Sequence, residues 1–439
     1  MQGRTILELP LEVLGNIFNF LNIYDLCNLM RTCKTFKNLI IHDNAIWRKR
    51  ARDKLIIRNP LTRDPENLCW YNRCRISNNW CQGIYKNQIV LHHDTLYMPW
   101  LKFHNTEILL LALGSDLFCF PTDNRGFPYC KSTLWALDVP TVRRYDVRTN
   151  DISRFVIRDN ILVCGNRDGC VAVFLVNNPR RKPTLLCHIE DCHHGGQVEV
   201  SAVEIIKTDS SLCVLTGSHK SSQLCMWSWR LTHNDYEYLS EEMQNMNYRN
   251  DIKTLPKNLG VRCLATNKSN DKIAIGLTGN NSPLVLDYQI NDFQLDVEVS
   301  KNGKSVIRDI QWHNENTVAH VSHSGMLQLT DIRIKQMVYE SMDPFQSSLY
   351  CVKSDGNNAL VVGASEYSRC VLFDVRRPAR HVQMYFTQKK SSPIYSLDFS
   401  SSKLLAAADR SIALVNFDVN PAVAKKHDYS DVFEVIARN

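Results

Sequence analysis

One six-residue pattern recurs seven times between residues 98 and 399, and it constrains the fold more than any other feature of the sequence. It consists of an apolar residue, two variable residues, a second apolar residue, one more variable residue and a residue that is usually apolar. The copies begin at Met98, Ile152, Val200, Val261, Ile307, Leu349 and Ile394. Successive copies lie 42 to 61 residues apart, a period typical of repeated supersecondary units. The pattern therefore predicts a repeat fold in which each copy opens one unit.

Each copy is followed by a second apolar strand, a polar turn and a third strand. The plan is clearest at residues 161–164, the turn 166–169 and residues 171–174, and it returns around the turn 322–325. Two units end at Phe373-Asp374 and Phe417-Asp418, where a WD repeat ends in Trp-Asp. These features resemble WD repeats, although the Trp-Asp and Gly-His dipeptides are missing. The resemblance implies a seven-bladed β-propeller over residues 83–420. A strand at 83–91 would complete the last blade and close the ring, which removes exposed sheet edges.

Residues 9–52 have the apolar spacing of short helices. Leu11, Leu14, Ile17, Phe18 and Leu21 recur at intervals of three and four residues, and Pro10 suits a first helical turn. Asp25 and Asn44 are the expected caps of two further helices. A three-helix module of under 50 residues buries little core by itself, so several of its apolar side chains should contact a partner.

The run from Leu9 to Ala51 resembles the F-box. The features that carry the resemblance are the Leu-Pro opening, the apolar first helix, and Leu26, Leu29, Cys33, Phe36, Leu39 and Trp47 at the expected intervals. Phe36 departs from the pattern, since many members have Trp there. The resemblance implies docking on the Skp adaptor of a cullin–RING ubiquitin ligase. By analogy the contact residues would be Leu9, Pro10, Leu14, Ile17, Phe18, Leu26, Leu29, Cys33 and Trp47. We expect about half of them to face the adaptor and the others to pack against each other.

Residues 53–82 are expected to form a helical linker between the two modules. Asp64-Pro65-Glu66 is a favourable helix start, and the helix should run from Pro65 to about Asn78. The segment Asn79-Trp80-Cys81-Gln82-Gly83 then leads into the first β segment and is similar to an Asn-Trp-x-x-Gly sequence of F-box proteins with WD repeats. The sequence therefore predicts an α+β multidomain chain, with an F-box at 1–52, this linker, the propeller at 83–420 and a C-terminal tail at 421–439. A helical spacer would hold the modules at a fixed distance, unlike a flexible Gly/Ser linker.

The formal net charge of +7 is concentrated in one segment. Residues 31–58 contain nine Lys or Arg and two Asp, which equals the whole excess of the chain. This distribution argues against a nucleic-acid-binding surface spread over the chain. We interpret it as a basic helical face that meets an acidic partner, with an ordinary solvated surface as the alternative for any single residue.

The 16 cysteines are scattered through apolar segments, as expected of small buried hydrophobic residues in a reducing compartment. The densest cluster contains Cys187, Cys192, His193 and His194, but no second ligand pair follows at zinc-finger spacing. We expect a polar loop there, with a structural or regulatory metal ion left open, and no cofactor. No apolar run approaches the roughly 18 residues that cross a bilayer, and the N-terminus is unlike a signal peptide. We therefore expect no membrane contact and a cytoplasmic or nuclear location.

In WD-repeat propellers the second residue of the recurring pattern starts the innermost strand of a blade, at the rim of the central channel. Here these positions are Pro99, Ser153, Ser201, Arg262, Arg308, Tyr350 and Tyr395. Arginine binds carboxylate or phosphate through two parallel hydrogen bonds, and tyrosine supplies rigid contact area. We therefore expect a protein substrate to bind at Arg262, Arg308, Tyr350, Tyr395, Ser153 and Ser201, through an acidic or phosphorylated peptide.

No nucleophile elbow, phosphate-binding loop or zinc-protease motif is present, so we do not expect an enzyme. The resemblance to F-box/WD-repeat proteins implies a substrate-recognition subunit of a Skp–cullin–F-box ligase, which reaches the cullin and RING subunits through the adaptor. The alternative is a non-degradative F-box scaffold that binds the adaptor without delivering substrates. An enzyme built on a propeller is the remaining alternative.

Overall fold

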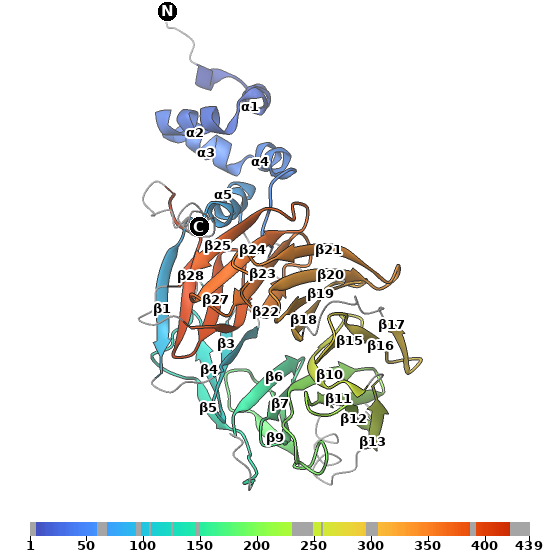
Figure 1. Ribbon diagram of the computed structural model, residues 1–439. Helices are drawn as coiled ribbons and strands as arrows, with labels where there is room; N and C mark the ends of the chain where they lie inside the picture. Colours follow the sequence, from blue (N-terminus) through green and yellow to red (C-terminus); the bar gives the residue numbers. More distant parts are fainter. Residues whose placement is uncertain are drawn as a thin grey trace, which may run out of the picture.

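The computed structural model describes residues 6–58, 68–93, 98–104, 107–123, 126–144, 150–230, 249–255, 258–295, 306–386 and 392–421. They form a helical N-terminal module and seven four-stranded antiparallel sheets. Figure 1 shows helices α1–α4 projecting from one end of the ring of sheets, with α5 lying between the two parts. The predicted fold class is confirmed. Among the described residues no helix has the length and apolar character needed to span a membrane.

The helical module contains four helices after a short 3-10 turn, where the sequence predicted three. They are α1 (Leu11–Phe20), α2 (Ile23–Thr32), α3 (Lys34–His42) and α4 (Asn44–Ala51), preceded by η1 (Ile6–Glu8). The extra break lies at Cys33, whose backbone is extended between α2 and α3. The caps also differ from those predicted. The side chain of Asn22 accepts from the Asp25 amide at 2.9 Å, and Asp43 accepts from the Ala45 amide at 2.9 Å. Asp25 instead lies in the first turn of α2, where its negative charge is still favourable.

The linker helix α5 (Trp70–Cys81) is shifted toward the C-terminus from its predicted position. Its expected start at Pro65 lies outside the described residues, whereas Leu68 and Cys69 precede the helix and Trp80 lies in its last turn. Trp80 is fully buried and stacks on Phe417 with ring centroids 3.6 Å apart, while its indole N–H donates to the Ser401 carbonyl at 2.8 Å. Asn79 donates to the Phe417 carbonyl at 2.8 Å. These contacts with the last blade hold the end of the helix in place and fix α5 to the propeller.

The propeller has seven blades, and each copy of the recurring pattern falls on the first strand of a blade, as predicted. Blade 1 contains β2 (Trp100–His104), β3 (Ile108–Leu113), β4 (Asp116–Pro121) and β5 (Trp135–Asp138). Blade 2 contains β6 (Ile152–Arg158), β7 (Ile161–Asn166), β8 (Val171–Leu175) and β9 (Thr184–Ile189). Blade 3 contains β10 (Ala202–Lys207), β11 (Ser211–Gly217), β12 (Gln223–Arg230) and β13 (Arg249–Thr254). Blade 4 contains β14 (Val261–Thr266), β15 (Lys272–Leu277), β16 (Leu284–Asp287) and β17 (Asp292–Leu295).

The last three blades follow the same plan. Blade 5 contains β18 (Ile307–Asn314), β19 (Thr317–Ser322), β20 (Met326–Asp331) and β21 (Gln336–Met342). Blade 6 contains β22 (Leu349–Ser354), β23 (Ala359–Ala364), β24 (Arg369–Asp374) and β25 (His381–Tyr385). Blade 7 contains β26 (Ile394–Phe399), β27 (Lys403–Ala408), β28 (Ser411–Asn416) and, as its outermost strand, β1 (Lys86–His92).

The ring is closed by strands from its two ends. The first strands of successive blades contact one another around the whole circle, including β26 with β2. Strand β1 pairs with β28 from Lys86 opposite Asn416 to His92 opposite Ser411, so the last blade joins the N-terminal and C-terminal ends of the propeller. The predicted closing strand is confirmed. This pairing covers the edge of β28, which would otherwise be available for pairing with another chain.

Glycines at the end of second strands explain why neighbouring blades approach so closely. A Cβ built on Gly217 would lie 2.4 Å from Val261, and one built on Gly276 would lie 2.7 Å from Ile307. In both cases the neighbour is the first apolar residue of the pattern in the next blade. Gly165 and Gly363 meet the equivalent residues of blades 3 and 7 in the same way. The recurring pattern therefore encodes the packing between blades as well as the strands themselves.

Candidate functional site

The predicted adaptor-binding residues divide into two groups in the structure. Leu14, Phe18, Leu26 and Trp47 are at most 4% exposed and form the core of the helical module. The remaining five have accessible surface: Leu9 and Pro10 are exposed, and Ile17, Leu29 and Cys33 are half-buried. The burial assigns the first group to packing within the module, whereas contact of the second group with an adaptor stays a prediction.

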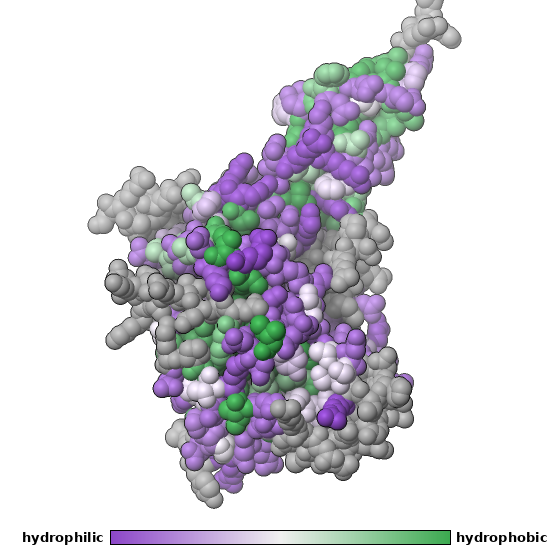
Figure 2. Space-filling view, turned by 90° about the vertical axis from the view of Figure 1, so that its right-hand side faces the viewer, coloured by the Kyte–Doolittle hydropathy of each residue, from purple (hydrophilic) through white to green (hydrophobic). Residues whose placement is uncertain are grey.

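The sequence-based contact set left out the most exposed apolar side chains of the module. Leu11 is 63% exposed, Phe20 is 91% exposed and Tyr24 is 75% exposed, and Ile6, Leu7 and Val13 are also exposed. Figure 2 shows hydrophobic residues gathered over the helical module that projects from the propeller. A cavity of about 590 Å³ between α1 and α3 is lined in part by Leu11 and Leu39. Exposed apolar side chains gathered on one small module are typical of an interaction surface. The signal was present in the sequence, because α1 is apolar on more than one face.

Four of the predicted substrate-binding residues lie together at the rim of the channel, on the adjacent blades 4 to 7. The guanidinium carbon of Arg308 lies 4.8 Å from the ring centroid of Tyr350, in a cation–π contact. The rings of Tyr350 and Tyr395 meet edge to face, with centroids 5.6 Å apart. Arg308 also contacts His323, with Nη2 and Nδ1 3.1 Å apart. The rim therefore combines cationic and aromatic groups within a short distance.

The two rim arginines form no ion pair within 4.0 Å of a described carboxylate, although the charge of Glu199 acts on Arg262. Among the described residues the buried Nε of Arg308 has no hydrogen-bond partner. Burial lowers the pKa of Arg262, the positive charges of Arg308 and Arg154 lower it further, and the charge of Glu199 acts to raise it. Arginines held close together with no carboxylate within ion-pair distance favour binding of an anion.

The two predicted rim serines are engaged in bonds that join loops and blades. The Ser153 hydroxyl lies 2.9 Å from the carbonyl oxygen of Gly165 and also contacts the carbonyl of Val200. The Ser201 hydroxyl lies 2.9 Å from His219 Nδ1 and accepts from the His219 amide at 2.8 Å. Pro99 is buried. A ligand would therefore find the hydroxyls of both serines already hydrogen-bonded.

A second group of rim residues, which the sequence did not predict, lies on the loops. Glu199 lies 2.8 Å from His219 and 3.4 Å from Arg167, both of which follow the second strand of a blade. Burial acts to raise the pKa of Glu199, but the His219 hydrogen bond and the Arg167 charge bring it below its ordinary value. The pKa of Tyr395 is raised above its usual range by burial, by a hydrogen bond with Asp409 and by Tyr350. The polar turns after the second strands were the available signal for these loop positions.

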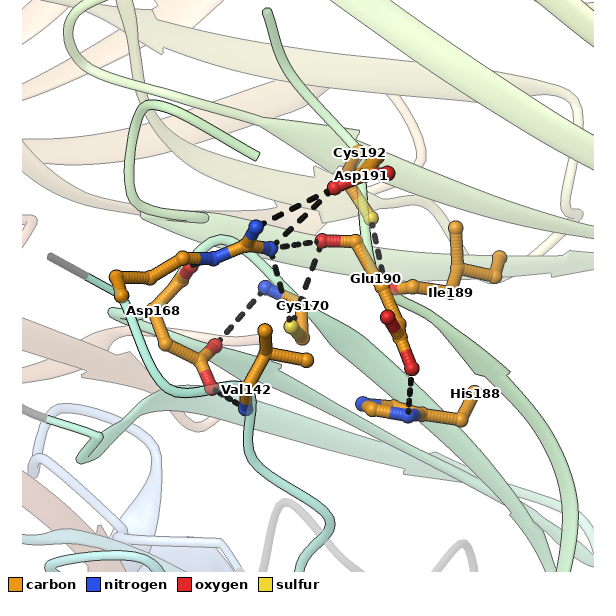
Figure 3. Close-up of polar contacts among 9 residues, drawn as sticks. Val142, Asp168, Cys170, His188, Ile189, Glu190, Asp191 and Cys192 are labelled. Atoms are coloured by element: carbon orange, nitrogen blue, oxygen red, sulfur yellow. Dashed lines mark hydrogen bonds and ion pairs between the residues drawn. The ribbon is translucent and has the colours of Figure 1, made fainter. Parts of the chain in front are cut away.

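Arg144 ties together the loops of blade 2 near the predicted Cys/His cluster. Its guanidinium contacts the Glu190 carbonyl and Cys170 Sγ, and lies 3.4 Å from the Asp191 carboxylate. Figure 3 shows Cys170, Glu190 and Asp191 close together, with Cys192 and His188 pointing to other partners. The arrangement stabilises the loop that leads from blade 2 to blade 3.

The side chains of the Cys/His cluster do not converge. Cys192 Sγ donates to the Ile189 carbonyl at 3.6 Å, and His193 Nδ1 lies 3.6 Å from Cys225 Sγ. Burial raises the pKa of the Cys187 thiol to about 11, which disfavours the thiolate that binds metal. In the described part of the chain no group of three or more His, Cys, Asp or Glu side chains is arranged to hold a metal ion.

Known proteins similar to this chain were found in both sequence and structure comparisons. An F-box-like family model matches residues 6–53. The chain is 22% identical to F-box/WD repeat-containing protein 4 of Mus musculus over 94% of this chain and 93% of that protein. It is 21% identical to F-box/WD repeat-containing protein 4 of Homo sapiens over 95% of this chain and 94% of that protein. Among solved structures, the computationally designed Ika8 protein aligns with 73% of this chain and 83% of its own, with a TM-score of 0.48 and 15% identity.

Proposed function

We propose that this chain, which is similar over nearly its whole length to F-box/WD repeat-containing proteins, is the substrate-recognition subunit of a Skp–cullin–F-box ubiquitin ligase. In this proposal the helical module docks on the Skp adaptor and, through it, joins the cullin and RING subunits. The propeller rim captures the protein substrate. The chain itself performs no catalytic step and acts in the cytoplasm or nucleus.

The observation that carries the proposal is the placement of the two candidate surfaces at opposite ends of the molecule. The apolar surface of α1 and α2 lies at the free end of the helical module (Figure 1). Trp80 of α5 contacts Phe399, at the end of β26, whereas Tyr395 lies near the start of the same strand at the rim. A strand of six residues spans about 20 Å. A receptor that bridges a ligase to a substrate needs two separate surfaces on one rigid body, and α5 provides the rigid connection.

The chemistry of the rim favours an acidic or phosphorylated peptide as the recognised segment. Among the described residues neither Arg262 nor Arg308 has a carboxylate within 4.0 Å, so their guanidinium groups can bind a carboxylate or phosphate. Tyr350 and Tyr395 supply rigid aromatic area beside them. A peptide with an anionic group next to an apolar side chain would fit both features.

The first experiment tests the adaptor surface. Leu11→Asp and Phe20→Asp place charges on exposed positions, so the module should still fold while co-purification with the Skp adaptor and cullin is lost. The matched control is Asn28→Asp, an exposed polar position on α2. Adaptor binding by Leu11→Asp and Phe20→Asp at the level of the unsubstituted chain would contradict the proposal.

The second experiment tests the rim and separates the receptor from the scaffold alternative. Proteins that accumulate when the chain is depleted should be captured by the unsubstituted chain and lost by Arg262→Ala or Arg308→Ala. An Arg181→Ala control removes a positive charge from an exposed turn away from the rim. If the chain binds adaptor and cullin but no protein accumulates on depletion, the non-degradative scaffold is the better description. If both rim variants capture these proteins as well as the unsubstituted chain does, the rim is not the substrate-binding surface.

A further inference from the structure

A second basic site lies at the other end of the channel, between the propeller and the helical module. A cavity of about 1360 Å³ is lined by the ends of the innermost strands, by α4 and α5 and by the segment that connects them. Eleven of its described lining residues are Lys or Arg and four are Asp or Glu. Part of the basic segment 31–58 therefore faces this cavity. The sequence had suggested instead that the segment faces a partner or solvent.

Six of the eleven cations come from the propeller itself. Lys102 of β2, Arg158 of β6 and Lys353 of β22 line the cavity, and among the described residues none of them has a carboxylate within 4.0 Å. Burial, followed by the charge of Lys353, lowers the pKa of Lys102 to about 8. The Lys102 ammonium donates to the Ile157 carbonyl at 3.3 Å. Charge is thus concentrated here without an ion-pair partner for these three groups.

The helical module and its connection supply cations from the opposite side. Arg48 and Arg52 at the end of α4, and Lys54 and Arg58 just after it, line the same cavity. The backbone amide of Arg58 donates to the Asp355 carboxylate at 3.3 Å, which places the connection directly against blade 6. Other lining cations are already paired: Arg154 with Asp309 at 2.8 Å and Arg376 with Asp374 at 2.7 Å. The remaining positive charge comes from two parts of the chain that would repel each other across the cavity.

We propose that this cavity binds a small molecule carrying several phosphate groups, which joins the helical module to the propeller. The ligand would accept hydrogen bonds from Lys102, Arg158 and Lys353 on one side and from Arg52, Lys54 and Arg58 on the other. Bridging of this kind replaces repulsion between like charges with charge-assisted hydrogen bonds. It would stiffen the connection between the adaptor-docking surface and the rim.

The distribution of the cations favours a compact polyphosphate over an acidic peptide. Blades 1, 2, 4 and 6 and the helical module all contribute positive groups, so the ligand must present anions in several directions from one centre. An extended peptide spaces its side chains along a line at about 3.3 Å per residue. A compact multiply phosphorylated molecule carries more negative charge in the same volume, because each phosphate group bears up to two charges near neutral pH.

Isothermal titration of the full chain with inorganic tripolyphosphate tests the site. The titration needs no adaptor, so its result is independent of the proposed ligase function. We expect one site per chain at 0.15 M salt, and at least tenfold weaker binding by the double variant Arg158→Gln/Lys353→Gln. The matched control Arg181→Gln/Lys182→Gln removes the same two charge types from an exposed turn and should bind within twofold of the unsubstituted chain.

Thermal melting without ligand shows whether the cavity variant Arg158→Gln/Lys353→Gln is still folded. Because Arg158→Gln/Lys353→Gln removes repelling charges, its melting temperature should equal or exceed that of the unsubstituted chain, and tripolyphosphate should raise it less. Equal tripolyphosphate affinity for the cavity variant and the unsubstituted chain would overturn the proposal. So would loss of binding in Arg262→Gln/Arg308→Gln instead, which would place the ligand at the rim. A hexaglutamate peptide that binds more tightly than tripolyphosphate and depends on Arg158 and Lys353 would assign the cavity to an acidic protein segment.

Discussion

At the scale of single residues, a fully buried ion pair joins blades 5 and 6. Arg369 and Asp343 form two parallel hydrogen bonds of 2.7 and 2.8 Å, and both side chains are 0% exposed. The second carboxylate oxygen also accepts from the amides of Phe345 and Ser347, so the charge of Asp343 is shared among several donors. Removing one member of such a pair leaves the other charge buried and unpaired, which is costly.

We predict that Arg369→Met and Asp343→Asn each lower the free energy of unfolding by about 3–5 kcal/mol. The double variant should lose less than the sum of the two, because it leaves no unpaired charge. Chemical denaturation of the three variants measures both effects. Arg333→Met is the control, since Arg333 is 65% exposed in its pair with Asp331, and its loss should lower the denaturation midpoint far less than Arg369→Met does. Additive losses in the double variant would contradict the pairing.

Only some of the single residues at the site could be predicted from the sequence. Arg262, Arg308 and Tyr350 were predicted at the rim because the repeat fixes their place on the innermost strands. Glu199 and His219 were missed because they lie on loops whose lengths differ from blade to blade. The burial of part of the predicted adaptor-binding set could not be read from spacing, since one apolar stripe serves equally for a core and for an interface.

At the scale of elements, strand positions followed from the sequence better than helix boundaries. The seven first strands and the closing strand β1 were predicted because alternating apolar residues and polar turns recur in one register. The limits of α5 were misplaced because they depend on Trp80 packing against Phe417, which is 337 residues away in the chain. The break at Cys33 was likewise hidden in an uninterrupted apolar spacing. Local pattern determines the strands, whereas contacts distant in sequence determine where these helices end.

The packing between blades gives a prediction at this scale. Gly217→Ala brings a methyl group to within 2.4 Å of Val261 in the next blade, so we expect it to lower the free energy of unfolding by about 1–3 kcal/mol. In a chain that already carries Val261→Ala, Gly217→Ala should cost less, because the smaller side chain at position 261 leaves room for the new methyl group. Urea denaturation monitored by tryptophan fluorescence measures the change.

Gly15→Ala in α1 is the control. The nearest atom to a Cβ built on Gly15 is 3.6 Å away, and alanine in a helix should raise the free energy of unfolding by about 0.5–1 kcal/mol. Strictly additive effects of Gly217→Ala and Val261→Ala would show that the two residues do not compete for space.

At the scale of the whole molecule, buried titratable groups set the pH range in which the chain is stable. Burial lowers the pKa of His193 and of His320 from 6.5 to about 4. Burial also raises the pKa of several thiols, including Cys119, Cys213 and Cys263, from 9.0 to about 12. The neutral forms of both residue types are therefore favoured in the folded chain. Lys102 acts in the opposite direction on the alkaline side, because its pKa is lowered from 10.5 to about 8.

We predict maximal stability between about pH 6.5 and pH 9, with losses on both sides. As the pH falls from 6.5 toward 4, the unfolded chain binds protons at His193 and His320 that the folded chain does not, so each contributes a loss of up to about 3 kcal/mol. Above pH 9 the unfolded chain releases thiol protons that the folded chain retains, and these several thiols outweigh the single Lys102. Urea midpoints measured from pH 5 to pH 10 under reducing conditions should trace this curve. In His320→Gln the stability should fall less steeply below pH 6.5, because only one of the two titrating imidazole rings remains. This holds even if the substitution also lowers the stability at pH 7. An unchanged slope below pH 6.5 in His320→Gln would show that other groups control acid unfolding.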